Sequence, residues 1–122
     1  MDLWSLTRLT PKLYKDLARR GSILAAGLAE AARDARVRLH VNAFGSLVTP
    51  FFTASPVRDY DSALTANTRA YAAFFRAMLA RGIYPPPSQF EAWFLSAAHT
   101  DRHVRRTVEA AKAAMRDVAR TV

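Results

Sequence analysis

The chain has 122 residues, a formal net charge of +8 and no cysteine, which gives enough length for a single domain over 1–122 with its own core. The lack of cysteine excludes a disulfide framework, a thiolate nucleophile and a cysteine-ligated zinc site. The sequence shows no signal-peptide pattern and no apolar run long enough to cross a bilayer, so we expect a cytoplasmic protein with no membrane partner.

The N-terminal third predicts one long amphipathic helix over 11–34. Leucine and alanine side chains recur there at helical spacing, which places them on one face. Thr10 suits the N-cap and Pro11 the first helical position. Gly21 lies inside this helix and is a point at which it could be interrupted.

Two strands joined by a tight turn follow the helix. Strict alternation of apolar and polar residues predicts a strand over 36–43 with one wet face. Gly45 and Ser46 then form a short connection to a second strand over 46–53. Pro50 lies within that second strand and has no N–H for a ladder, so we expect a sheet edge or a bulge there.

The second half of the chain predicts two further helices and a third strand. A helix over 66–81 carries apolar residues at helical spacing, and Gly82 ends it in the left-handed conformation. A short helical turn is expected over 88–92 and a strand over 93–98. The last helix, over 100–120, again has one apolar face.

These elements predict an α+β fold. We expect a three-stranded antiparallel sheet with the helices packed mainly on one face. A sheet covered on one side can leave apolar surface open, and contiguous apolar patches mark interfaces. The aromatic residues expected at such a surface are Phe51, Phe52, Trp93 and Phe94.

No residue pattern identifies a catalytic group or a metal site. His40, His99 and His103 do not share a metal-ligand spacing, so each is interpreted as a structural or surface histidine. The serines lack the context of an activated nucleophile, and the glycines form no phosphate-binding loop.

One carboxylate lies in an unusual setting. Three prolines precede Ser88 and Glu91, which have the S-x-x-E spacing of a capping box. Such a cap contributes about 1 kcal/mol. The alternative interpretation is a pocket wall, because the prolines and a one-turn helix would hold the carboxylate rigidly beside aromatic surface. The two roles are compatible, since a carboxylate has two oxygens.

The most specific stretch of the chain is GIYPPPSQFEAWFLSAAHT, at residues 82–100. It resembles the pattern G-[VI]-Y-x-x-P-S-x-F-E-x-x-F-x-S-x-A-H-T of the glutamate-1-semialdehyde 2,1-aminomutases. Further stretches that resemble the family in the same order are NAFGSLVTPFFT, VRDYDSA and YAAFFRAMLARGIY. The resemblance covers about 10–118 and corresponds to the small C-terminal domain only.

Two positions depart from the family pattern. Pro50 replaces an ordinary strand residue, so the second strand is expected to be irregular. His103 occupies the third position of the last helix, where the family tends to have an acidic residue, so we expect a weaker cap there.

The resemblance implies part of a class III aminotransferase of fold type I. The family is a pyridoxal-phosphate (PLP) isomerase that moves an amino group within glutamate semialdehyde to give 5-aminolevulinate for porphyrin biosynthesis. Its large domain supplies the PLP-binding lysine, and none of the lysines here, Lys12, Lys15 and Lys112, has that lysine's context. We therefore expect no PLP on this chain alone and no activity. In the family, the glutamate matching Glu91 lies on the wall of the cofactor pocket, with Ser88 as the cap that supports it.

The expected partner is a large PLP-binding domain or a second copy of the chain, as in the homodimers of the intact family. A related class III aminotransferase is an alternative source of this small domain. A different alternative is a stand-alone basic module that binds nucleic acid through Arg36, Arg38 and His40 on the sheet. The arginines are scattered along the chain rather than clustered, which favours a solvated surface without a specific nucleic-acid site.

Overall fold

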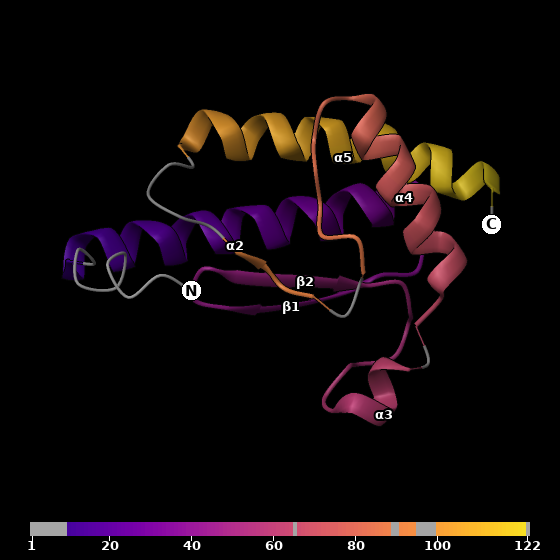
Figure 1. The fold of residues 1–122 in the computed structure, drawn as a ribbon, viewed down its shortest axis with the longest axis horizontal. Coiled ribbons are helices and arrows are strands. Elements are labelled where there is room, and N and C mark those ends of the chain that lie inside the picture. Colours follow the sequence, from indigo (N-terminus) through magenta and orange to yellow (C-terminus); the bar gives the residue numbers. More distant parts are fainter. Residues whose placement is uncertain (1–9, 65, 89–90, 95–99, 122) are drawn as a thin grey trace.

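A computed structural model describes residues 10–64, 66–88, 91–94 and 100–121 (Figure 1). Helix α2 lies between the β1–β2 hairpin and helix α5, and α4 crosses one end of this arrangement. The fold is α+β, as predicted. The elements in chain order are α2 (Pro11–Asp34), β1 (His40–Phe44), β2 (Leu47–Phe51), α3 (Tyr60–Ala63), α4 (Thr68–Ala80), β3 (Trp93–Phe94) and α5 (Asp101–Thr121).

The predicted first helix is confirmed and is continuous through Gly21. The hydroxyl oxygen of Thr10 accepts a hydrogen bond of 3.1 Å from the amide of Leu13, and Pro11 occupies the first turn. This cap satisfies one of the amides that a helix start leaves without a partner.

The first strand begins at His40, four residues later than predicted. The residues that follow α2 form its C-terminal cap instead of a strand. Arg36 adopts a φ of +61°, and the amide of Val37 donates to the carbonyl of Ala32 at 2.8 Å. This is the hydrogen-bond pattern of a Schellman motif, here with arginine in the position usually held by glycine. A residue in the left-handed region cannot continue a strand, so the alternating pattern over 36–39 was misleading.

Strands β1 and β2 form the predicted antiparallel hairpin, with Phe44 opposite Leu47 beside the turn. Gly45 has a φ of +58°, which explains why glycine occupies the first turn position. Pro50 is buried in β2, the central strand of the order β1-β2-β3. It needs no bulge, because the described pairing of β2 with β3 involves only Leu47 and Val48 and does not extend to Pro50.

The third strand is described over two residues only. Trp93 pairs with Val48 and Phe94 with Leu47, while residues 95–98 of the predicted strand lie outside the described part. Helix α3 was not predicted. It is a single turn held by hydrogen bonds between Asp59 and Ser62. The Asp59 amide donates to the Ser62 hydroxyl, and the amide and hydroxyl of Ser62 both donate to the Asp59 carboxylate. These bonds from Ser62 lower the pKa of Asp59.

The main core lies between α2, α4, α5 and the inner face of the hairpin. Its fully buried side chains include Leu24, Leu28, Phe74, Met78 and Met115. The expectation of an open aromatic surface at the strands was wrong for three of its four residues. Phe51, Phe52 and Trp93 are 7%, 3% and 8% exposed, because helix α4 and the segment after β2 cover them.

Both later helices are confirmed. Gly82 follows α4 with a φ of +78°, as predicted. The start of α5 is better capped than expected, because Nδ1 of His103 accepts from the amide of Thr100 at 3.1 Å. The Thr100 hydroxyl accepts in return from the amide of His103 at 3.3 Å. His103 thus takes the place of the glutamate of a capping box.

An ion-pair cluster ties the start of α5 to α2. The Arg20 and Arg19 guanidinium groups approach Asp101 at 2.8 and 3.1 Å and lower the pKa of that carboxyl. Among the described helices, none is long and apolar enough to cross a membrane.

Candidate functional site

The segment after α4 carries Glu91, the carboxylate singled out in the sequence. A buried tyrosine of α4 holds this segment by a hydrogen bond. Tyr71, on α4, is 3% exposed. Its hydroxyl donates a short hydrogen bond to the carbonyl of Pro86. The triple-proline segment is thereby fixed to the helix two residues before Ser88.

Ser88 and Glu91 form a compact turn, called here the Glu91 turn (Ser88 with Glu91). The amide of Glu91 donates to the carbonyl of Ser88 at 3.1 Å, and Oε2 of Glu91 accepts from the amide of Ser88 at 3.4 Å. The return arm of the predicted capping box is therefore present, at the long end of the hydrogen-bond range. Ser88, Glu91 and Ala92 are not helical, so the helix predicted over 88–92 is absent at these described positions.

Four buried aromatic rings pack together on α4 and on the chain before and after it. They are called here the aromatic floor and comprise Phe52, Tyr71, Phe74 and Trp93. Trp93 stacks on Phe74 with ring centroids 6.1 Å apart, and Tyr71 and Phe52 pack against the same Phe74 ring at 6.1 and 5.5 Å. The indole Nε1 of Trp93 is buried without a hydrogen-bond partner in the described part of the chain. Glu91 is exposed and lies two residues before Trp93, whose ring belongs to this buried aromatic cluster.

The electrostatics of the floor link Tyr71 to Glu91. Burial raises the pKa of the Tyr71 hydroxyl to about 12, and the negative charge of Glu91 adds to the rise. The nearby indole N–H of Trp93 acts in the opposite direction, although their geometry falls short of a hydrogen bond. Tyr71 is thus a neutral donor at neutral pH. Sequence patterning identified it only as part of a helix face, because its partner carbonyl is fifteen residues away.

We expect alkaline destabilisation that depends on Tyr71. An unfolded chain loses the tyrosine proton near pH 10, whereas the folded chain holds it to about pH 12. Stability from this group is therefore complete below pH 10 and is lost as the pH rises toward 12, by roughly 2 kcal/mol in all. Urea unfolding at pH 8 to 11.5 measures the slope. The Tyr71→Phe variant should have a lower free energy of unfolding at pH 8. Above pH 10 its free energy of unfolding should fall less steeply with pH than that of the wild type. Equal slopes in the two proteins would contradict this assignment.

The geometry also predicts how the Glu91 turn responds to substitution. Ser88→Ala keeps the backbone amide that donates to Glu91 and removes only the hydroxyl, so it should lower the free energy of unfolding by at most about 1 kcal/mol. Glu91→Gln should cost less, since the amide oxygen can still accept from the Ser88 amide. Chemical denaturation of the two variants compares these costs. A larger loss for Glu91→Gln would mean that the carboxylate charge itself stabilises the fold.

Among the residues that the structure describes, neither the histidines nor the lysines gather into a site. His40 is half-buried in β1 and His103 caps α5, while His99 lies outside the described residues. No group of three metal-ligating side chains occurs within the described ranges. Lys12 and Lys15 are exposed on α2, and Nζ of Lys112 lies 3.2 Å from Oε1 of Glu109.

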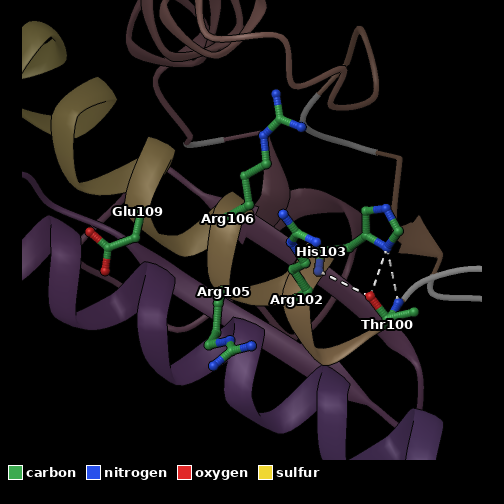
Figure 2. Close-up of a pocket in the computed structure, with 6 residues that line it drawn as sticks. All are labelled: Thr100, Arg102, His103, Arg105, Arg106 and Glu109. Atoms are coloured by element: carbon green, nitrogen blue, oxygen red, sulfur yellow. Dashed lines mark hydrogen bonds between the residues drawn. The ribbon is translucent and has the colours of Figure 1, made fainter.

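A cleft of about 860 Å³ at the start of α5 is lined by several arginines. Figure 2 shows that its arginines diverge, with Arg105 extending toward α2 and Arg106 extending to the opposite side. Guanidinium groups that do not converge cannot enclose one phosphate. The residues lining this cleft are Thr100, Arg102, His103, Arg105, Arg106 and Glu109.

The observed bounds of β1 count against a nucleic-acid-binding face on the sheet. Arg36 and Arg38 precede β1 and belong to the connection from α2, so of the three residues proposed for a basic sheet face only His40 lies in a strand.

Comparison with known proteins shows which part of a larger enzyme this chain resembles. The chain is 48% identical over 113 residues to a glutamate-1-semialdehyde 2,1-aminomutase from Sorangium cellulosum, with 93% of this chain and 26% of that protein covered. The chain matches the C-terminal part of glutamate-1-semialdehyde 2,1-aminomutases. It spans about a quarter of the length of these curated aminomutases. No family model matches the chain.

Solved structures agree on the fold of this aminomutase region. An omega-transaminase from Sphaerobacter thermophilus superposes with a TM-score of 0.80 at 33% identity, covering 93% of this chain and 26% of that one. A transaminase with PLP bound superposes with a TM-score of 0.76 over 98% of this chain and 26% of its own, and its 22% identity supports the fold alone. The relatives of this chain are PLP-dependent enzymes.

Proposed function

We propose that this chain acts as the small C-terminal domain of a PLP-dependent glutamate-1-semialdehyde 2,1-aminomutase. The observation that carries the proposal is 48% identity over 93% of the chain against only 26% of the relative. Similarity over nearly the whole chain but only a quarter of the relative supports a part of a larger enzyme. The reaction, the formation of 5-aminolevulinate in the cytoplasm, would then require a large domain and the homodimer that the family resemblance implies.

The residues of this chain do not by themselves fit PLP. The cofactor is held by a lysine in a shielded pocket, and here the lysines are exposed on α2 or lie beside Glu109. The role that fits the described geometry is a supporting one. Glu91, exposed two residues before Trp93 of the aromatic floor, would form part of the wall of a pocket completed by the large domain, with Ser88 fixing its carboxylate.

We therefore expect the isolated chain to bind no stoichiometric PLP and to have no aminomutase activity. An absorbance titration with PLP should show only the free cofactor plus weak reaction with exposed lysines. The control is a triple variant in which Lys12, Lys15 and Lys112 are changed to arginine. An absorbance band that forms with one PLP per chain, and that is lost when a single lysine is replaced, would contradict the absence of a PLP site.

The proposed function is tested by grafting. The chain replaces the corresponding C-terminal residues of the Sorangium cellulosum aminomutase, whose own truncated form serves as the inactive control. We expect a soluble, PLP-loaded chimera that forms 5-aminolevulinate from glutamate semialdehyde. A chimera that folds and holds PLP but lacks this activity would overturn the assignment to an aminomutase.

A second candidate is the small domain of a related class III aminotransferase. It is favoured by the omega-transaminase, which matches the chain at 33% identity and a TM-score of 0.80. The same graft onto that transaminase distinguishes the two proposals. Activity with amine donors in the transaminase chimera, without aminomutase activity in the first chimera, would support the second candidate.

A further inference from the structure

Three exposed apolar side chains gather at the turn of the β1–β2 hairpin. Phe44 is 81% exposed, Tyr14 is 52% exposed and Leu47 is 38% exposed. These three residues are called here the hairpin tip. Large apolar side chains with this much exposure are normal when scattered, and a group of them indicates an interface.

Phe44 and Leu47 flank the hairpin turn, and Tyr14 reaches Gly45 of that turn from α2. Phe44 and Leu47 are opposite each other in the hairpin register, so both lie on the same face of the sheet. The hydroxyl of Tyr14 lies 3.4 Å from the position that a Cβ on Gly45 would take. Tyr14 of α2 therefore lies beside the turn that carries Phe44 and Leu47, and the start of α2 and the hairpin turn lie toward the same end of the molecule in Figure 1.

The chain covers the opposite end of this sheet face but leaves the hairpin tip open. At that end, Phe51 is 7% exposed and is covered by Val57, Ala63 and Ala66 of the following segment. In the middle of the face, the Asn42 amide donates to the carbonyl of Val57 at 2.9 Å. One face of the same sheet is thus covered by its own chain at one end and uncovered at the other.

The occupant follows from where the relatives continue. The chain matches the C-terminal part of enzymes about four times its length, so in those enzymes most residues precede the position of Thr10. Thr10 begins α2 at the end where the hairpin tip lies. We propose that the hairpin tip, formed by Tyr14, Phe44 and Leu47, is the surface on which the large PLP-binding domain docks. This inference rests on the proposed function and adds a location to it.

Variants of the Sorangium chimera test this surface. Phe44→Asp places a charge in the proposed contact, and Ile23→Asp is the matched control because Ile23 is 44% exposed on α2 outside the tip. We expect Phe44→Asp to lower the Tm of the chimera by about 5 °C or more, with weaker retention of PLP. Ile23→Asp should change both quantities far less. Circular dichroism of the isolated chains checks that each variant still folds.

The outcomes separate the two proposals. An inactive wild-type chimera would count against the proposed function whatever the variants do. An active wild-type chimera whose Tm and PLP retention are unchanged by Phe44→Asp would overturn the docking surface alone. Dimerisation of the isolated chain that Phe44→Asp abolishes, seen by sedimentation velocity with an unaffected chimera, would assign the tip to a second copy instead and would also overturn it.

Discussion

Gly21→Ala should destabilise the protein by about 2 kcal/mol, although alanine is the better helix former by about 1 kcal/mol. Gly21 is buried in α2 where the helix crosses the hairpin turn. A Cβ added there would lie 2.4 Å from the carbonyl oxygen of Gly45. The neighbour is backbone rather than a flexible side chain, so α2 and the hairpin would have to separate.

Ser22→Ala is the matched control, because Ser22 is the next residue of the same helix and is exposed. Without a packing conflict, it should be neutral or slightly stabilising. Denaturant unfolding of both variants gives the comparison. Equal effects of the two substitutions would show that the close approach to Gly45 does not determine the position of α2.

Features that depend on local chemistry were predicted well. The three long helices follow from amphipathic spacing, a threonine–proline start and a glycine end, all of which act within a few residues. The late start of β1 was missed because the Schellman motif at Arg36 uses a non-glycine residue in a left-handed conformation. No residue type marked that position, and alternation alone favoured a longer strand.

Burial was predicted less well, because it depends on which distant segments meet. Phe51 looked like a surface aromatic, but the segment ending at Ala66 folds back over it. Phe44 and Leu47 form the exposed pair, although their β-rich sequence resembles that of the buried pair Phe51 and Phe52. The outcome was decided by tertiary packing and not by hydrophobicity.

The candidate site shows the same division. The hydrogen bond from the Ser88 amide to Glu91 could be predicted from the spacing, whereas the helix that the pair was expected to cap is absent at the described positions. The hydrogen bond from Tyr71 to Pro86 and the stacking of Trp93 on Phe74 join residues fifteen or more positions apart. These contacts hold the backbone on either side of the Glu91 turn, and only the three-dimensional structure reveals them.

Phe74→Ala should have the largest effect of all, a loss of about 3 to 5 kcal/mol in the free energy of unfolding. Phe74 is fully buried, and its ring contacts Phe52, Tyr71 and Trp93. Removing it leaves a cavity in the aromatic floor, and a loss of this size is comparable to the whole stability of a small domain. Phe75→Ala is the control, because this neighbouring ring is only half-buried and should cost about half as much. Urea unfolding followed by tryptophan fluorescence, in a Trp4→Phe background so that the signal comes from Trp93, reports both stability and the indole environment. If Phe74→Ala unfolds at the same urea concentration as Phe75→Ala, the aromatic floor does not hold the candidate site in place.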